Sequence, residues 1–272
     1  MCALLLVAAT EAATAQDVFA PPDAPTRYLA LLTGESIAVD GQLDELVWQR
    51  AEPITEFIQK DPNQGDPITY STAVRVAYDD TALYIAAICH QPRDAARVQN
   101  LKRDFSYDDN DLFGVAIDGF MDQRNAVVFQ TTPYGSQRDM EVIDGSEFNP
   151  DWDARWNVKT RIEDDRWVAE IAIPWRNLRY PSGAEELGVI FARNIRSLNE
   201  KTSAPAVPRV FTIYRMAYQG VLTGLQTPPP STNLQLNPYT LVQRVDGDVD
   251  SSTDFEVGGE LKWAITQSTV LD

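Results

Sequence analysis

The sequence has little of what catalytic and metal sites are usually built from. It contains two cysteines and one histidine among 272 residues, which is too few for a disulfide framework, and no zinc-ligand spacing appears. His90 has no Ser or Cys nucleophile motif to serve, and no Gly-rich phosphate loop occurs. No catalytic residue is therefore predicted. A glycoside hydrolase stays open as an alternative, because its paired carboxylates are defined by their separation in space.

Positive charge is also scarce. The chain has 23 Lys and Arg against 40 Asp and Glu, which gives a formal net charge of -17. No Lys/Arg cluster supplies the basic face that binding to a phosphate backbone requires. Nucleic acid and anionic membrane surfaces are therefore not expected as partners. The acidic surplus indicates a well-solvated surface, with calcium or weak sugar contacts as sharper alternatives.

The apolar run nearest the N-terminus is too short to span a bilayer, which takes about 20 apolar residues. It covers Ala3–Ala9 and is followed by Ala13-Thr14-Ala15, a small-x-small pattern typical of a signal-peptidase site. We expect a signal peptide over 1–15, although no Lys or Arg precedes the run. Its removal would take Cys2 away and leave Cys89 as a small core residue.

What the chain does have is strand-like alternation broken by turns. Two hairpins are predicted, 73–78 with 83–88 around Asp79-Asp80, and 156–162 with 167–173 around 163–165. Further strands are predicted over 112–117, 126–131, 139–143, 187–195 and 210–216. A helix is expected over 43–50 with Asp40 as its cap, and a helical turn over 174–178. Short strands at intervals of about ten residues predict an all-β, antiparallel, jelly-roll-like sandwich.

Proline-rich segments suggest the domain boundaries. We expect a linker over 16–33, the sandwich over 34–226 and a stiff linker over 227–233. In 234–272, two alternating segments flank an acidic loop, with Tyr239 and Trp263 placed to meet a membrane interface. This C-terminal hairpin matches the weak signature of outer-membrane β-barrel strands, and would then start a longer barrel. An ordinary hairpin packed on the sandwich is the alternative.

Three runs carry the most specific pattern. They are Ile37–Trp48, which contains Asp40-Gly41 and Asp44-Glu45, then Tyr78–Ala86 and Trp167–Trp175. Together, in this order and spacing, they resemble the family 9 carbohydrate-binding modules over Ile37 to about Tyr218. The resemblance implies a β-sandwich that binds glycans and often accompanies hydrolases.

Other runs resemble a bacterial family of unknown function. They are Arg124–Gln130, Pro133–Asp139 and Asn194–Glu200. In that family such a sandwich precedes an outer-membrane barrel. The resemblance implies an exported protein, in the periplasm or outer membrane of a Gram-negative bacterium, with its own C-terminal barrel as a partner.

Candidate ligand residues follow from what sugars need, namely aromatic faces and polar groups for hydroxyls. Trp152 and Trp156 flank a turn-rich loop and are the expected platform, whereas Trp48 and Trp167 lie in regular elements and are expected in the core. The densest polar cluster contributes Arg103, Asp108, Asp109 and Asp111, and the adjoining strand contributes Arg138 and Asp139. Calcium could bind at the cluster, but its spacing does not fit a calcium loop, and a solvated loop is the alternative.

The sequence thus predicts non-catalytic binding of an oligo- or polysaccharide. Two other functions stay open, namely a structural or interaction domain of an outer-membrane barrel protein and a glycoside hydrolase.

Overall fold

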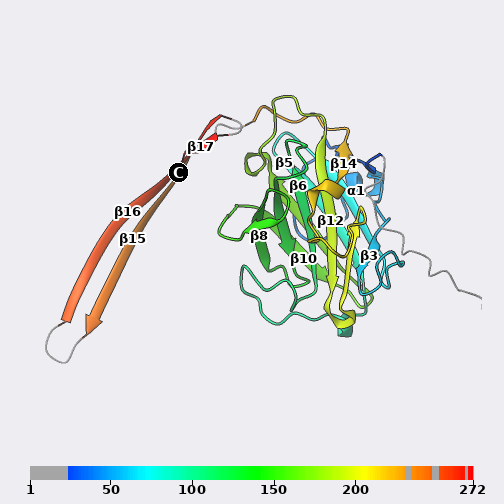
Figure 1. Ribbon diagram of the computed structural model, residues 1–272, viewed down its shortest axis with the longest axis horizontal. Helices are drawn as coiled ribbons and strands as arrows, with labels where there is room; N and C mark the ends of the chain where they lie inside the picture. The colour runs from blue at the N-terminus through cyan, green and yellow to red at the C-terminus, as the bar shows by residue number, and fades with distance from the viewer. Residues whose placement is uncertain (1–23, 231–233, 247–250, 267–268, 272) are drawn as a thin grey trace, which may run out of the picture.

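The computed structural model describes residues 24–230, 234–246, 251–266 and 269–271. Within the last three ranges it describes side chains only at 239–242 and 255–259. The signal peptide expected over 1–15 lies outside the described residues. None of the described helices has the length and apolar character needed to cross a bilayer. The predicted all-β sandwich is confirmed (Figure 1).

Two sheets form the sandwich. The larger contains β1 (Arg27–Leu29), β3 (Ile58–Asp61), β6 (Leu112–Asp118), β7 (Ala126–Thr131), β8 (Gln137–Ile143), β9 (Glu147–Asn149), β12 (Leu187–Ile195), β13 (Glu200–Ala204) and β14 (Gly220–Thr223). Its order is β1-β14-β12-β6-β7-β8-β9, and β13 pairs with both β12 and β3. The smaller contains β2 (Leu31–Leu32), β4 (Thr72–Tyr78), β5 (Ala82–His90), β10 (Asn157–Ile162) and β11 (Arg166–Pro174), in the order β10-β11-β5-β4-β2.

The main core lies between the two sheets. Alternate residues point inward, such as Val74 and Val76 of β4, and Phe113 and Val115 of β6, each with 0% exposure. Full burial of each such side chain stabilises the fold by about 1.5–3 kcal/mol. Cys89 lies in this core, and burial raises the pKa of its thiol to about 11, so it packs as a small apolar residue.

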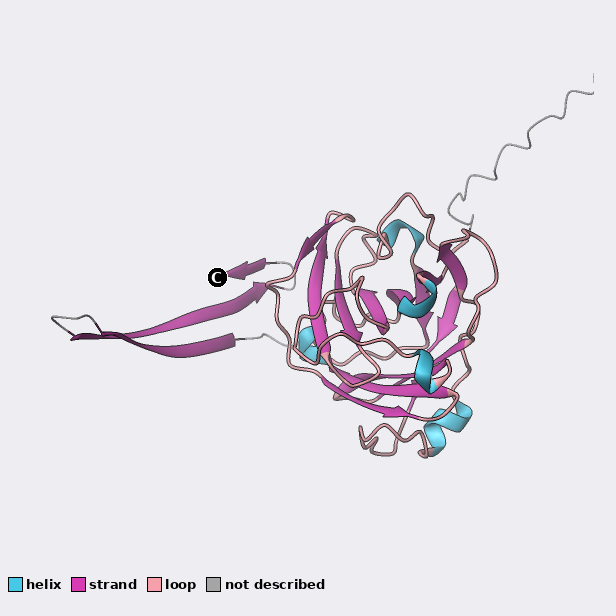
Figure 2. Cartoon of the chain, turned by 90° about the horizontal axis from the view of Figure 1, so that it is seen from below, coloured by secondary structure: helices cyan, strands magenta, loops and turns pink. Residues whose placement is uncertain are grey.

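Both outer faces are covered as well. Residues from 37–48, which include the start of α1 (Leu46–Arg50), pack on the smaller sheet through a cluster around Trp48. Residues from 207–218, ending in the short helix η4 (Met216–Tyr218), pack on the larger sheet. Of the other helical turns, η2 (Trp175–Asn177) and η3 (Arg196–Leu198) directly follow β11 and β12, and η1 (Arg93–Ala95) starts shortly after β5; Figure 2 shows that the helical segments are few and short.

The strand predicted over 210–216 is wrong. The segment instead makes successive turns, in which the Phe211 N–H donates to the Pro208 carbonyl at 3.1 Å and the Arg215 N–H to the Thr212 carbonyl at 3.2 Å. Ile213 is buried against the outer face of the larger sheet. The apolar residues of this segment therefore cover the outer face of the larger sheet and do not form a strand.

Two boundaries also differ from expectation. Residues 27–32 were expected in a linker, but β1 and β2 pair in parallel with β14 and β4. The helix starts at Leu46 with Glu45 at its cap position, because Asp40 is already engaged. The Asp40 carboxylate accepts from the Gln42 N–H at 2.7 Å, and Gly41 has a φ of 85°, which forms the expected turn.

A buried cation joins the two sheets at one end of the sandwich. Arg193 of β12 has 0% exposure. Its guanidinium donates to Thr72 Oγ1 at 2.8 Å, to the His90 carbonyl at 2.7 Å and to Gln91 Oε1 at 3.0 Å. Burial lowers the pKa of Arg193. The neutral oxygen atoms of Thr72, His90 and Gln91 accept hydrogen bonds from the buried guanidinium.

The predicted C-terminal hairpin is present. Strands β15 (Leu234–Asp246), β16 (Ser251–Thr266) and β17 (Thr269–Leu271) form a separate sheet, drawn in Figure 1 as an arm apart from the sandwich. Its described side chains include exposed apolar residues, namely Tyr239, Leu241, Val242, Phe255 and Val257. The Tyr239 ring lies over its register partner Gly258, where an added Cβ would be 2.2 Å from Cζ of the ring.

Candidate functional site

The two expected platform residues differ in exposure. Trp156 is 5% exposed in the main core, with its ring centroid 5.4 Å from that of Phe129. A ring so placed presents no free face, so the expectation of an exposed Trp156 is wrong. Trp152 also packs on Phe129, at 5.9 Å, but it is only half-buried. Of these two tryptophans, Trp152 is the one whose side chain is partly exposed to solvent.

A charged cluster lies beside the loop that bears Trp152, and Asp153 connects the two. Arg103 Nη2 donates to Asp139 Oδ1 at 2.5 Å, and the same guanidinium pairs with Asp153 and donates to Gln137 Oε1 at 3.1 Å. The side chain of Asp153 is 75% exposed, whereas that of Asp139 is 1% exposed. The structure therefore brings Arg103, Asp139 and the loop bearing Trp152 together.

Asp139 serves this cluster from inside the fold. Its Oδ2 accepts the Ala154 N–H at 2.5 Å. Burial raises the pKa of Asp139, against the lowering effects of that N–H and of Arg103. Asp139 holds Arg103 and the 150–156 loop in place and is too buried for direct contact with a sugar.

Arg138 does not join this cluster. Adjacent residues of a strand point to opposite faces of a sheet, and Asp139 is the register partner of the inward-facing Phe129. Arg138 therefore faces outward, where its guanidinium donates to Gln130 Oε1 at 3.3 Å. Gln130 in turn donates to Tyr214 Oη at 2.9 Å beneath the 207–218 cover.

The acidic run 108–111 is divided in the same way. Asp108 is exposed and accepts from Lys201 Nζ at 2.7 Å. Asp111 has 0% exposure, and its carboxylate accepts the backbone N–H groups of Arg97 at 2.8 Å and Arg196 at 2.5 Å. Burial raises the pKa of Asp111, and these hydrogen bonds oppose the shift. Asp111 is a structural anchor and not a ligand contact.

Asn110 has the same anchoring role. It also has 0% exposure, and its Oδ1 accepts the Gln99 N–H at 2.7 Å while its Nδ2 donates to the Ser106 carbonyl at 2.7 Å. Asn194 Nδ2 donates to the Asn110 carbonyl at 2.8 Å. The loop that follows η1 and the turn that follows β12 are therefore fixed by two fully buried polar side chains.

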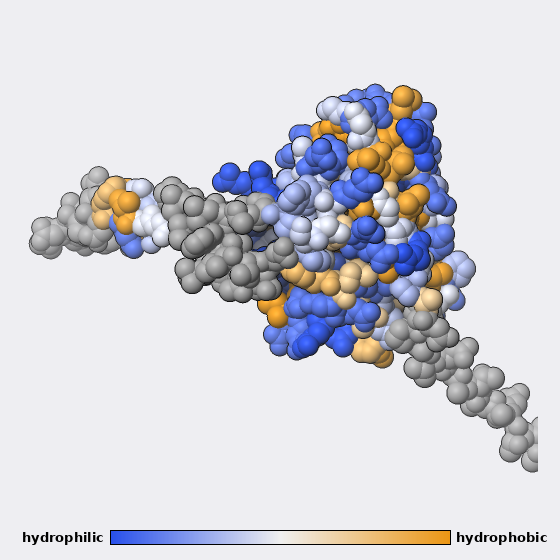
Figure 3. Space-filling view, turned by 90° about the horizontal axis from the view of Figure 1, so that it is seen from above, coloured by the Kyte–Doolittle hydropathy of each residue, from blue (hydrophilic) through white to orange (hydrophobic). Residues whose placement is uncertain are grey.

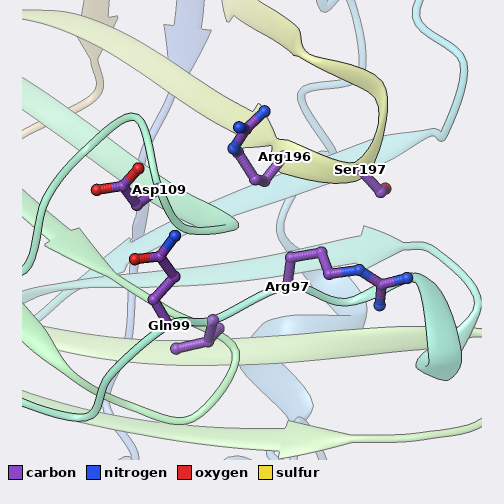
Figure 4. Close-up of a pocket in the computed structure, with 6 residues that line it drawn as sticks. Arg97, Gln99, Asp109, Arg196 and Ser197 are labelled. Atoms are coloured by element: carbon purple, nitrogen blue, oxygen red, sulfur yellow. The ribbon is translucent and has the colours of Figure 1, made fainter.

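These anchors border a surface hollow of about 330 Å³, lined by Arg97, Val98, Gln99, Asp109, Arg196 and Ser197. We call it the Arg196 hollow. Figure 4 shows Gln99 and Asp109 at one end and Ser197 at the other, with Arg196 between these ends and the guanidinium of Arg97 on the side of Ser197. Of the sequence candidates only Asp109 lines it. Arg97, Gln99 and Arg196 were missed, because no motif marks residues that meet only through the buried Asn110 and Asp111.

Calcium finds no support at the acidic run. Within the part of the chain that the structure describes, no three His, Cys, Asp or Glu side chains gather as a metal site would require. Asp108 and Asp111 diverge, since one pairs with Lys201 at the surface and the other turns inward.

Comparison with solved structures gives the same fold. A family 9 carbohydrate-binding module from Caldicellulosiruptor kristjanssonii, in complex with glucose, matches with a TM-score of 0.53 at 17% identity, over 76% of this chain and 98% of that one. A second structure so described, in complex with cellotriose, has the same score and identity, over 76% and 95%. A proposed carbohydrate-binding protein from Bacteroides uniformis ATCC 8492 has a TM-score of 0.55 at 11% identity, over 74% and 99%.

Sequence comparison adds the family. No curated protein matches the chain. The family model described as carbohydrate family 9 binding domain-like matches residues 39–204, which is more than half of the chain and includes two of the three runs from which the resemblance was predicted and the first run from Val39 onward. The chain belongs to the carbohydrate family 9 binding domain-like family.

Proposed function

We propose that the sandwich binds carbohydrate without catalysis. The observation that carries this proposal is the family membership over residues 39–204. Two structures of similar fold were solved with glucose and with cellotriose, which supports a glucan-type oligosaccharide as the first ligand to test.

Trp152 and the Arg103 cluster form the primary contact in this proposal. The apolar face of a sugar ring stacks on an aromatic side chain, and charged or amide groups take its hydroxyls. Trp152 offers the remaining surface of its ring, and the exposed Asp153 beside it offers a carboxylate already paired with Arg103. Stacking and hydrogen bonding are therefore available in one place.

A matched pair of tryptophan variants tests the proposal. We expect Trp152→Ala to weaken cellotriose binding about fivefold or more in calorimetric titration, since stacking of a nucleic-acid base on one aromatic ring is worth about 1–3 kcal/mol, and to keep the fold with a smaller loss of stability than Trp156→Ala. Trp156→Ala should instead lower stability by about 3–5 kcal/mol, as for other buried Trp residues. No binding of the unsubstituted protein to any saccharide on a glycan array would overturn the proposal.

We further propose that the C-terminal hairpin begins an outer-membrane β-barrel and that the protein is exported to the cell envelope. The supporting observation is the arm itself. Its strands of 13 and 16 residues exceed the about 9–11 needed to cross a bilayer. Val242, Phe255 and Val257 leave 61–67% of their surfaces exposed, which in water is unfavourable for a two-stranded hairpin.

Membrane association tests this second proposal. The full chain should float with liposomes of neutral lipid in a density gradient, because the arm would bury its apolar side chains there. A triple variant with Val242, Phe255 and Val257 replaced by Thr should stay in the soluble fraction. A matched variant, in which Leu29, Leu32 and Leu46 of the sandwich are replaced by Thr in the same way, should still float. Recovery of the unsubstituted chain only in the soluble fraction would contradict the proposal.

A further inference from the structure

We propose that the Arg196 hollow is a second subsite, one that takes an acidic sugar unit, a hexuronate. This inference rests on the proposed function, since it names a class of carbohydrate. It uses residues that lie outside the Trp152 and Arg103 contact, and so the two can be tested separately.

The lining of the hollow suits a molecule with one negative group and several hydroxyls. Arg97 and Arg196 each bring a guanidinium, which pairs with a carboxylate in a planar, two-bond geometry. Asp109, Gln99 and Ser197 bring the acceptors and donors that hydroxyls need. A hexuronate carries both kinds of group on one ring.

The two cations of the hollow have no carboxylate in a direct ion pair with them, although Asp109 lines the same hollow and the buried Asp111 lies against their backbone. In the described part of the chain, neither Arg97 nor Arg196 forms an ion pair with a carboxylate. Arg97 Nη1 donates to the carbonyls of Asp94 at 2.6 Å and Ala96 at 3.0 Å, and Arg196 donates to the Asn199 side chain. In a chain with a net charge of -17, these guanidinium groups are the cationic groups that the hollow offers to an anion, and Asp109 is the like charge in its lining.

The hollow is also held in shape before any ligand arrives. Asn110 and Asp111 fix the backbone of Gln99, Arg97 and Arg196 through hydrogen bonds of 2.5–2.8 Å. A backbone that is fixed in advance loses less conformational freedom on binding, which strengthens the complex. The volume of about 330 Å³ lies near the lower limit of ligand sites, about 300–1,000 Å³. The hollow therefore fits one sugar unit, and the rest of the oligosaccharide would lie outside it.

A free acid and its methyl ester give the sharpest test, because they differ only in the charge that the hollow would recognise. The probes are trigalacturonic acid and its methyl ester, titrated by calorimetry against the full chain at low salt. We expect the acid to bind about tenfold or more tightly than the ester, since hydrogen bonds to charged groups contribute about 1.5–3 kcal/mol. The preference should shrink as salt is raised.

Four variants assign the preference to the hollow. Arg196→Gln and Arg97→Gln should each weaken binding of the acid and leave the ester unchanged, whereas Asp109→Asn should strengthen binding of the acid by removing a like charge. Arg93→Gln, an exposed arginine outside the hollow, is the matched control and should change neither. Thermal unfolding of each variant establishes that the fold is kept.

The outcomes separate the two proposals. Equal affinity of acid and ester, or an equal effect of Arg196→Gln on both, would overturn the acidic subsite while cellotriose binding through Trp152 stands. Selective loss of the acid in Arg196→Gln, with cellotriose binding unchanged, would support the subsite alone. Absence of binding to cellotriose, acid and ester together would overturn both.

Discussion

Glu170 is a single buried carboxylate that organises a whole sequence motif. It lies on β11 with 0% exposure, and its Oε2 accepts the N–H groups of Asp40 at 2.9 Å and Gly41 at 3.0 Å. Its Oε1 accepts the indole N–H of Trp48 at 3.1 Å. The residues of the motif around Asp40-Gly41 and Trp48 are thus joined by a residue about 120–130 positions away in the chain, and without Glu170 their donors would be buried unpaired.

This arrangement predicts a pH dependence with a definite sign. Burial raises the pKa of Glu170 above its ordinary 4.5, despite the lowering effects of the N–H donors. The folded state then binds this proton more tightly than the unfolded chain does, so the contribution of Glu170 to stability is greatest below about pH 4.5 and is lost as the pH rises through the folded-state pKa. Glu170→Gln removes this titration. It also replaces one accepting oxygen by an NH₂ group, which would face an N–H donor without an acceptor between them.

Denaturant unfolding across pH 4–8 measures the effect. We expect Glu170→Gln to unfold about 1–3 kcal/mol more easily, with the advantage of the natural residue shrinking as pH rises. Glu52→Gln, at an exposed position, is the control. An advantage that grows with pH would mean that the N–H donors outweigh burial, against the stated direction.

Single residues also show where sequence reasoning reached its limit. The Asp40-Gly41 turn and the core position of Trp48 were predicted correctly, because turn chemistry and large apolar surface act locally. The exposure of Trp156 and Asp111 was not, because burial depends on which distant segments arrive. Asp111 accepts N–H groups from residues 14 and 85 positions away, and no local pattern encodes that.

At the scale of elements, the cover over the larger sheet depends on one glycine. Gly114 of β6 faces Tyr214, and an added Cβ would lie 2.4 Å from Tyr214 Oη and 2.8 Å from Gln130 Cγ. Since Tyr214 is only 1% exposed, its ring has little room to move. The absence of a side chain at Gly114 is what lets the 207–218 segment lie flat on the sheet.

Replacement of this glycine should therefore loosen the cover. We expect Gly114→Ala to lower the free energy of unfolding by about 1–3 kcal/mol through overpacking and to speed proteolysis within 207–218. Adding Tyr214→Phe should restore part of the loss, because it removes the oxygen nearest to the new methyl group. Gly34→Ala, where nothing lies within 4 Å, is the control, and equal stability of the two single variants would refute the prediction.

Elements differed in how well the sequence predicted them. Both predicted hairpins and the C-terminal pair are present, since their strands are neighbours in the chain and their turns are readable. β1, β3 and β14 were missed, because they are short and find partners far along the chain, and β13 was missed although it also pairs with the preceding strand β12. Residues 210–216 were predicted as a strand because a segment that covers a sheet needs apolar spacing too.

For the whole molecule, the covered faces decide where a ligand can bind. Clusters around Trp48 and Tyr214 cover part of the outer surface of each sheet, which leaves the ends and edges of the sandwich and the exposed face of strands such as β10. The loops at 97–111 and 150–156, which carry the Arg196 hollow and Trp152, lie there. Figure 3 shows a mainly hydrophilic surface with separate apolar patches, in keeping with polar recognition at a few places.

The parallel pairing of β1 with β14 has a mechanical consequence. The described chain enters the sandwich through β1 and leaves through β14, and the register runs from Arg27 opposite Val221 to Leu29 opposite Thr223. A pull on the two ends in opposite directions slides these strands past each other, so that their hydrogen bonds are loaded at once and not one after another. A module between a cell and an immobile polymer would carry tension across this pair, which is arranged to resist it.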